Sequence, residues 1–388
     1  MRWCSLGDRL RIALMSRYPP AHCGVGEYTR MLATSLSSIQ RDARLFVIST
    51  ELSGPEPYTD ENISVYPVLS EQRRDYSASL DILARENGAN ILHIEHEYGI
   101  FRDSQGLLNI VNEAKKERLV DKVVITLHTV YHPLSRRNDA LEFQASLRTP
   151  AIDMVVVHSR LQEFELEAQS VPMEKIIRIP HGTLINPYIS APRNRLRQSL
   201  GIEEGLNGLV LVVPGFIRPD KGLDVLLQAL NKVSFPYTLI VAGEFKDTRI
   251  KELIASNPSV IVIEKYLSHD EILKLIALSD VLVLPYRDKP GTYSVSGILH
   301  LSMGSLRPII GTRVPRLIEL YTRAPRMCVA PGSVEDLRRK LEWAYNNYDL
   351  AVAYMSELYA YAARTQWIRM AQRHLSLYRR LLAREAAS

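Results

Sequence analysis

Cysteine is scarce in this chain. The 388 residues include three cysteines, Cys4, Cys23 and Cys328, which lie far apart in the sequence. An odd number of distant cysteines excludes a disulfide framework, and their spacing does not fit a zinc site. This cysteine usage is typical of the reducing cytoplasm, and we expect the protein there.

Long apolar runs are also missing. Stretches such as 209–214 and 281–285 are far shorter than the roughly 18 to 20 residues that a membrane-spanning helix needs. Asp8, Arg9 and Arg11 interrupt the short apolar stretch near the N-terminus. We therefore expect neither a signal peptide nor a spanning helix, and any membrane contact would be peripheral, at the inner face.

Charge of one sign is not in large excess. The chain has 48 Lys and Arg residues against 43 Asp and Glu residues, a net charge of +5. So small an excess argues against nucleic acid as a partner and leaves anionic small molecules open. The P-loop motif, the dinucleotide-binding fingerprint and a metal-holding Asp-x-Asp pattern in the candidate loops are absent as well.

What the chain does contain is an alternation of short β-branched runs with longer segments of helical period. Runs that are apolar on both faces are typical of parallel strands covered by helices. The sequence therefore predicts an α/β fold with two doubly wound, Rossmann-like sheets. The runs are 11–15, 45–49, 91–94, 123–127 and 154–158 in the first part, and 209–214, 238–241, 260–263, 281–285 and 308–310 in the second.

The alternation lapses between the two sets of runs, in a segment with prolines and the basic stretch RNRLRQSL. We predict an N-terminal Rossmann-like domain over 1–182 and a linker over 183–207. A second Rossmann-like domain would follow over 208–350, with helices over 351–388. The last segment has apolar residues at helical spacing, at positions 367, 370, 374, 377 and 381.

The first predicted strand runs into Gly24-Val25-Gly26, which opens a predicted helix. Without side chains, Gly24 and Gly26 would let a ligand approach the backbone closely. A plain tight turn explains the same residues equally well.

A second strand-to-helix loop, from Gly215 to Gly222, contains Arg218 and Lys221. An arginine offers a planar fork of donors and a lysine a point charge, which together suit a diphosphate. A solvated basic loop is the alternative, and we interpret Asp220 as solvated.

A third candidate loop starts the helix after the run 281–285. Free N–H groups and two hydroxyls at such a position suit phosphate oxygens. A serine N-cap without a ligand is the alternative. The residues are Ser294, Val295, Ser296 and Gly297.

Histidines and carboxylates end two successive strands of the first half. His128 follows the run 123–127, and the segment HIEHEY, with His96 and Glu97, follows 91–94. We expect these side chains to face one crevice. His93 and His96 are three apart on a strand and point to opposite faces, which argues against a metal site. A hydrogen-bonded core histidine remains an alternative for His128.

Taken in order, many segments resemble family 4 retaining glycosyltransferases of the GT-B fold, and the resemblance covers nearly the whole chain. It implies two Rossmann-like domains that face across a cleft, an acceptor-binding one over 1–182 and a nucleotide-sugar-binding one over 208–350. The final helix would cross back to the N-terminal domain. The segments are YPPAHCGVGEYTR, HIEHEYGIF, TLHT, VVVHSRLQEFEL, KIIRIPHGT, GFIRPDKGLDVLL, VAGEF, DVLVLPYR, SGILHL and QWIRMAQRHLSLYRRLL.

The resemblance implies no cofactor and no metal, but a nucleotide diphosphate sugar such as UDP-glucose or GDP-mannose as donor substrate. Arg218 and Lys221 would hold the diphosphate and act in catalysis with His128, which would contact the transferred sugar. His96 and Glu97 would lie with His128 on the acceptor or sugar side. The other donor-binding residues would be Gly24, Gly26, Gly215, Tyr266, Leu267, Ser294, Val295, Ser296 and Gly297.

The chain departs from the family at two acidic positions. Counted back from Pro308, Tyr293 and Leu301 stand where family members carry glutamates, and Leu306 stands where glycine is usual. We favour a retaining, metal-independent hexosyltransferase that moves glucose or mannose to a hydroxyl of a sugar, lipid or small-molecule acceptor. The alternatives are a non-catalytic protein that binds a nucleotide sugar or a partner, and another GT-B enzyme such as a sugar-nucleotide epimerase.

Overall fold

The structure is a computed structural model that describes residues 10–203, 205–255 and 257–386; Cys4 lies outside these ranges. The chain divides into two compact units. The first holds the described residues of Met1–Gly182, Pro290–Val295 and Trp367–Ser388, and the second holds those of Thr183–Lys289 and Ser296–Gln366. The units are bounded differently from the predicted domains, because residues 183–203 and 205–207 pack with the second unit and so do residues 351–366.

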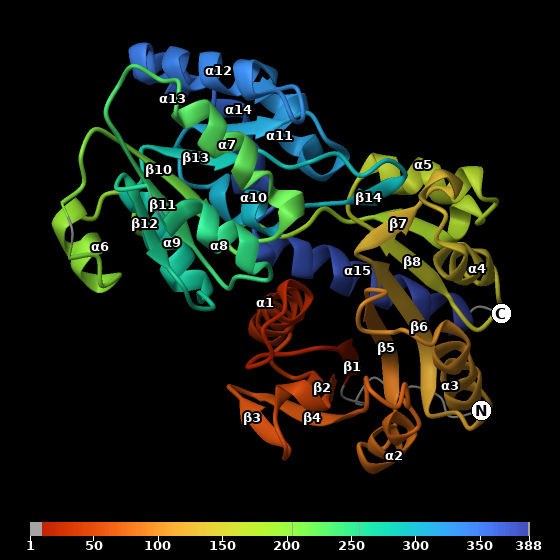
Figure 1. Ribbon diagram of the computed structural model, residues 1–388. Helices are drawn as coiled ribbons and strands as arrows, with labels where there is room; N and C mark the ends of the chain where they lie inside the picture. Colours follow the sequence, from red (N-terminus) through yellow and green to blue (C-terminus); the bar gives the residue numbers. More distant parts are fainter. Residues whose placement is uncertain (1–9, 204, 256, 387–388) are drawn as a thin grey trace. The chain divides into compact units, whose positions relative to one another are not determined.

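An eight-stranded sheet forms the first unit, in the order β3-β4-β2-β1-β5-β6-β8-β9 (Figure 1). β3 pairs antiparallel with β4, and the other neighbours are parallel. The strands are β1 (Arg11–Ser16), β2 (Arg44–Thr50), β3 (Tyr58–Asp60), β4 (Ile63–Leu69), β5 (Ala89–His96), β6 (Val120–Leu127), β8 (Met154–Val157) and β9 (Ile176–Arg178). A separate antiparallel pair joins β7 (Thr129–Tyr131) to β14 (Thr292–Ser294).

Two helices of the first unit, α3 and α5, begin at side-chain caps. Ser159 and Gln162 form a capping box at α5, and the Asp103 side chain accepts the N–H of Gly106 at α3. The α-helices are α1 (Gly24–Ile39), α2 (Ala78–Arg85), α3 (Ser104–Lys116), α4 (Asn138–Ser146), α5 (Arg160–Ala168) and α15 (Trp367–Ala386), and the 3-10 turns are η1 (Glu51–Ser53), η2 (Pro133–Ser135) and η3 (Met173–Lys175).

A six-stranded parallel sheet forms the second unit, in the order β12-β11-β10-β13-β15-β16. Its strands are β10 (Leu209–Pro214), β11 (Tyr237–Ala242), β12 (Val260–Ile263), β13 (Val281–Leu284), β15 (Ile309–Thr312) and β16 (Cys328–Val329). Its helices are α6 (Arg193–Ser199), α7 (Leu223–Leu230), α8 (Thr248–Ala255), α9 (His269–Leu278), α10 (Gly297–Ser302), α11 (Ile318–Arg323), α12 (Val334–Asn346), α13 (Tyr348–Ala353) and α14 (Ser356–Arg364), with the 3-10 turns η4 (Pro219–Lys221), η5 (Pro315–Leu317) and η6 (Pro325–Met327).

Each apolar run that predicts a strand is a strand in the structure, with ends that differ by at most three residues. The reason is burial on both faces: all residues of β8 and β10 are buried. The pattern misses β3, β4, β7, β9, β14 and β16, which are short or, in β4, carry a proline within the strand.

The C-terminal helix belongs to the first unit. α15 packs along α1, and both helices can be followed in Figure 1. The residues at positions 367, 370, 374, 377 and 381 are all buried, so the apolar spacing of this helix marks its packed face. The predicted α/β fold with a returning C-terminal helix is confirmed.

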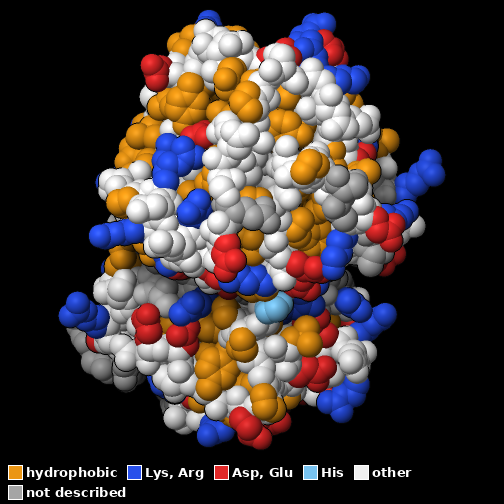
Figure 2. Space-filling view, turned by 60° about the vertical axis from the view of Figure 1, so that its left-hand side comes forward, with side chains coloured by type: hydrophobic (Ala, Val, Ile, Leu, Met, Phe, Trp, Pro, Cys, Tyr) orange, Lys and Arg blue, Asp and Glu red, His pale blue; other side chains and the backbone are white. Residues whose placement is uncertain are grey.

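The face of the molecule in Figure 2 has side chains of mixed character. On this face, Lys and Arg side chains are interspersed with Asp, Glu and apolar side chains. None of the described helices is both long enough and apolar enough to cross a membrane.

Candidate functional site

The loop between β10 and α7 directs a lysine side chain towards the protein interior. Gly215 follows β10 with φ of +95°, and Pro219–Lys221 forms the turn η4, which ends at Gly222 with φ of +66°. A Cβ atom at Gly222 would lie 2.0 Å from the carbonyl oxygen of Pro285, so this position requires glycine. The turn leaves the Lys221 side chain buried.

Asp220 is the centre of a cluster of cations. Its carboxylate oxygens lie 3.1 Å from Arg218 Nε, 3.4 Å from Arg316 Nη1 and 3.4 Å from Lys289 Nζ. Although burial favours the neutral acid, the cations lower the pKa of Asp220, Arg218 most strongly. The interpretation of Asp220 as solvated is wrong, because its side chain is only 13% exposed and lies among these cations.

Lys221 completes this cluster, which we call the Asp220 cluster: Asp220, Arg218, Lys221, Lys289 and Arg316. The Nζ atom of Lys221 lies 3.8 Å from the centroid of the Tyr286 ring. Burial, reinforced by repulsion from the two arginines, holds the pKa of Lys221 well below its ordinary value. One carboxylate thus faces four cations, and this net positive charge suits an anionic ligand.

One arginine of the cluster retains a free donor. The Nε atom of Arg316 is buried and forms no hydrogen bond within the part of the chain that the structure describes, whereas Arg218 Nε is ion-paired with Asp220. Buried donors without partners are costly, and phosphate oxygens would satisfy them. The sequence analysis missed Arg316, although its place just after a strand end, in GTRVPR, was a usable signal.

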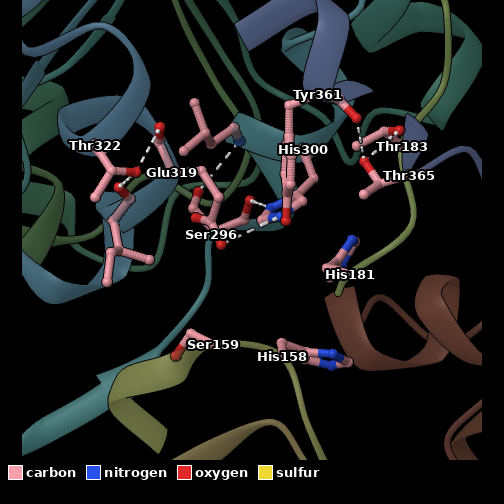
Figure 3. A network of polar contacts seen from close by, with 12 residues as sticks. His158, Ser159, His181, Thr183, Ser296, His300, Glu319, Thr322, Tyr361 and Thr365 are labelled. Carbon is pink, nitrogen blue, oxygen red and sulfur yellow. Dashed lines mark hydrogen bonds and ion pairs between the residues drawn. The ribbon is translucent and has the colours of Figure 1, made fainter. Parts of the chain in front are cut away.

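Ser296 connects to the cluster through Tyr286. Its Oγ atom accepts the N–H of Leu299 at 3.3 Å, as the cap of α10, and lies 3.2 Å from Tyr286 Oη. Figure 3 shows Ser296 beside His300, whose Nδ1 atom is 2.9 Å from the Ser296 carbonyl oxygen. The serine is therefore an N-cap, and Gly297 follows it as the first residue of α10.

The four residues of the third candidate loop do not lie in one unit. Ser294 and Val295 belong to the first unit, and Ser294 pairs with Thr129 between β14 and β7. Ser296 and Gly297 belong to the second unit. Only the latter two share a unit with the Asp220 cluster.

The segment predicted to receive the base lies beside an aromatic ring. The ring centroids of Tyr266 and Phe216 are 5.8 Å apart, which brings the loops after β12 and β10 together. Leu267 is buried in the core, so only its backbone remains for a ligand. Two neighbouring aromatic rings at strand ends offer a surface for a planar base.

In the first unit, His128 and Glu95 form a buried pair. His128 Nε2 lies 3.1 Å from one carboxylate oxygen of Glu95, and His93 Nε2 lies 3.4 Å from the other. Burial opposes ionisation of Glu95, but His93 and His128 lower its pKa to about 2. An ionised Glu95 fixes the ring orientation of His128. The sequence analysis left Glu95 without a role, although it lies in the same segment as His96.

An aromatic side chain covers His128. The Tyr28 ring of α1 lies edge-on to the His128 ring, with the centroids 4.7 Å apart. It also lies 5.1 Å from the rings of His158 and His181, both drawn in Figure 3, and 4.9 Å from Trp367. Tyr28 thus gathers three histidines of the first unit around one ring.

His93 and His96 lie on opposite faces of β5, as their spacing predicts. His93 Nδ1 is 2.6 Å from Tyr378 Oη, and His93 Nε2 is 2.7 Å from Thr126 Oγ1. The His96 ring is fully buried and stacks on Phe143, with centroids 4.2 Å apart. An enclosed ring does not reach an acceptor, so this placement gives no support to the role predicted for His96.

The remaining candidates of the first unit are more open. Glu97 is half-buried, and its carboxylate accepts the Thr129 hydroxyl at 2.8 Å. Gly24 is exposed, and a Cβ atom there would meet no atom within 4 Å, whereas Gly26 is buried. Among the described residues, no group of three or more His, Cys, Asp or Glu side chains is arranged to hold a metal ion.

The structure places all three residues at which the chain departs from the family, Tyr293, Leu301 and Leu306. Tyr293 lies in β14 of the first unit, and Leu301 is buried in α10. Leu306 has φ of +52°, a left-handed conformation that glycine adopts most easily. The backbone thus keeps the glycine-like turn although the residue is leucine.

Comparison with known proteins adds to this geometry. Residues 208–347 match the family model described as glycosyl transferases group 1. An uncharacterized glycosyltransferase of Methanocaldococcus jannaschii is 28% identical over 159 residues, which are 40% of this chain and 44% of that protein. The aligned part therefore spans less than half of that relative.

Solved structures resemble the whole chain. A glycosyltransferase from Rickettsia africae has a TM-score of 0.73 at 17% identity, over 97% of this chain and 99% of the other. HepE from Anabaena, solved with UDP and glucose, has a TM-score of 0.71 at 16% identity, over 95% and 99%. The likeness shows the GT-B fold, and with the family match it supports a GT-B glycosyltransferase.

Proposed function

We propose that the protein is a retaining hexosyltransferase of family 4. It moves glucose or mannose from a nucleotide diphosphate sugar, such as UDP-glucose or GDP-mannose, to a hydroxyl of its acceptor. The observation that carries the proposal is the Asp220 cluster, in which one carboxylate faces four cations at the ends of parallel strands. HepE, a protein of the same fold, was solved with UDP and glucose, which supports such a donor.

In this proposal the domain predicted over 208–350 binds the donor. Arg218, Arg316 and Lys221 hold the diphosphate, and the buried Nε donor of Arg316 bonds one of its oxygens. The rings of Phe216 and Tyr266 lie next to the base. Negative charge grows on the diphosphate as the sugar leaves, so the same cations stabilise the transition state more than the ground state.

The domain predicted over 1–182 handles the sugar and the acceptor. Glu95 holds the His128 ring through Nε2, which leaves Nδ1 for a hydroxyl of the transferred sugar. With retention, the acceptor hydroxyl attacks the anomeric carbon from the side of the leaving phosphate. The phosphate oxygen takes the hydroxyl proton, so no protein nucleophile is needed.

The reaction is proposed to need no divalent metal. A leaving nucleotide diphosphate has about two to three negative charges, and the cations of the Asp220 cluster offer comparable positive charge. The protein is proposed to act in the cytoplasm, with any membrane contact peripheral at the inner face.

A second candidate is a non-catalytic protein that binds nucleotide sugars. It is favoured by Tyr293 and Leu301, which replace the two acidic residues of the family. Such a protein would bind the donor through the same cations without turnover.

A panel of nucleotide sugars tests both candidates. Thermal shift identifies the donor, because a ligand at 100 times its dissociation constant adds about 2.7 kcal/mol of stability. Turnover with candidate acceptors, in excess chelator, then tests catalysis, and the anomeric proton signal of the product reports retention. Donor binding without transfer or hydrolysis would favour the non-catalytic candidate, and activity restored only by manganese or magnesium would contradict the metal-independent mechanism.

A further inference from the structure

A cavity of about 470 Å³ lies in the second unit, at the edge strand β16. None of its lining residues belongs to the Asp220 cluster. They come from the end of β15, from η6 and β16, from α12 and from the end of α13: Arg313, Pro325, Arg326, Cys328, Lys340, Trp343 and Tyr354.

Three of the lining residues are cations, and no acidic residue lines the cavity. Arg313, Arg326 and Lys340 form no ion pair within residues 10–203, 205–255 and 257–386. Arg326 donates to the Tyr354 hydroxyl. Burial lowers the pKa of Lys340. Like charges without a counterion repel each other, and an anion in the cavity would relieve this repulsion.

The lack of an acidic partner is a feature of this face of α12 and not of the whole helix. Arg338 pairs with Glu335 and Glu342, and Arg339 pairs with Glu335. The acidic residues that pair on this helix are thus engaged by its two arginines, whereas Lys340 points into the cavity. The helix therefore contains its own control residue, Arg339, with the same charge but a paired, exposed side chain.

Two aromatic rings form a wall of the cavity. The rings of Trp343 and Tyr354 are nearly parallel, at 6°, with centroids 5.7 Å apart. Lys340 Nζ lies 4.9 Å from the Trp343 centroid, and the Arg326 guanidinium lies 5.2 Å from the Tyr354 centroid. These cation–π contacts hold two of the charges at the wall. A ligand that meets the cations also meets apolar ring surface.

Cys328 contributes an apolar, unreactive surface. Its side chain is buried, and burial raises the pKa of its thiol to about 12. The thiol is the weakly nucleophilic form of cysteine. The cavity is thus suited to reversible binding and not to covalent chemistry at sulfur.

We propose that this cavity binds a small phosphate monoester. Its phosphate lies among Arg313, Arg326 and Lys340, and its body packs on Trp343 and Tyr354. The three cations suit a ligand with a phosphate dianion better than a ligand with a single carboxylate. The volume is that of a site for a small molecule, which falls at roughly 300 to 1,000 Å³. The proposal rests on this cavity alone and stands or falls independently of glycosyl transfer.

Calorimetric titration with glucose 6-phosphate tests it, with tryptophan fluorescence as a second readout. We expect one saturable site with a fluorescence change. Arg313→Gln and Lys340→Gln should each weaken binding by about tenfold or more, because each removes a charged hydrogen bond to the phosphate. Arg339→Gln on the same helix, with the same loss of charge, should bind within about twofold of the parent.

The Asp220 cluster is the competing phosphate site, and Arg218→Gln separates the two. This variant should bind glucose 6-phosphate as the parent does. If Arg218→Gln loses binding while Arg313→Gln retains it, the phosphate belongs to the Asp220 cluster and the proposal is overturned. No saturable binding in the millimolar range overturns it too. Equal affinity for inorganic phosphate overturns the contact of the ligand body with the aromatic wall.

Discussion

At the scale of single residues, the Asp220 cluster makes the sharpest prediction. Arg316→Gln and Lys221→Gln should each weaken UDP binding by about tenfold or more, because a charged hydrogen bond contributes roughly 1.5 to 3 kcal/mol. Calorimetry measures the affinity. Arg287→Gln is the matched control in the same region, since Arg287 is more exposed and pairs with Asp224. Parent-like binding by both cluster variants would contradict the donor assignment.

The buried Lys221 also predicts that donor affinity depends on pH. Its pKa in the empty site is held well below the ordinary value by burial and by the arginines. In the proposed function the charged form binds the diphosphate, so affinity should be constant below this lowered pKa and fall as pH rises above it. In the falling range, donor binding takes up protons, and calorimetry in two buffers of different ionisation heat measures this uptake. Lys221→Arg stays charged and should lose the uptake; an unchanged uptake would assign it to another group.

His128 and Glu95 predict a difference between binding and turnover. His128→Ala should reduce transfer much more than it reduces affinity for UDP, because the histidine is assigned to the sugar. Glu95→Gln should reduce transfer less, because it only loosens the ring that Glu95 holds at 3.1 Å. Thermal unfolding of both variants is the control. A loss of folding in His128→Ala, or equal losses of transfer and of UDP affinity, would favour the core-histidine alternative.

At the scale of elements, two glycines at helix starts should respond differently to alanine. Gly222→Ala should destabilise the second unit by about 2 kcal/mol or more, because φ is +66° and the new Cβ would lie 2.0 Å from the Pro285 oxygen. Gly24→Ala should leave stability unchanged or raise it slightly, because a Cβ there meets no atom within 4 Å. Thermal unfolding of both variants measures this.

Gly24→Ala also separates the two explanations of the first loop. If the backbone of Gly24 contacts the donor, the variant keeps its stability but binds the sugar nucleotide more weakly. If the glycine only forms a tight turn, the binding of the nucleotide sugar stays at the parent level. Gly24 is exposed, so the added methyl group would meet a ligand and not the protein core.

At the scale of the whole molecule, buried histidines predict sensitivity to acid. Burial lowers the pKa of His93 to about 4 and of His96 to about 3, and it also lowers the pKa of His374. The unfolded chain therefore binds more protons than the folded one, and stability falls as pH drops from about 6.5 towards 4. Each such histidine contributes up to about 1.4 kcal/mol per pH unit in this range. Denaturant unfolding at several pH values measures the slope.

His96→Phe removes one of these titrating histidines and so measures its contribution. Neither ring nitrogen of His96 has a hydrogen-bond partner among the described residues, and the ring stacks on Phe143. The change should therefore preserve or raise stability at neutral pH. At acid pH, the free energy of unfolding should depend less steeply on pH, by the equivalent of about one proton. Transfer should stay at the parent level, and a selective loss of transfer would restore the predicted acceptor role of His96.

The sequence by itself determined the strands, the α/β class and the packed face of α15. Strands buried on both faces need apolar residues throughout, and a helix packed on one face needs them at spacings of three and four, so both leave a local pattern. It also marked the loops that carry Arg218, Lys221 and His128, because strand ends can be read from the same pattern.

Only the tertiary structure decided which strand ends are neighbours. β13 lies beside β10, and β15 beside β13, although β11 and β12 come between β10 and β13 in the chain. This order brings Arg316 and Lys289 to Asp220 and makes a residue interpreted as solvated the centre of the cluster. Likewise, the enclosure of His96 depends on the ring of Phe143 from α4. A sequence pattern reports how deeply a segment is buried, but not which other segment covers it.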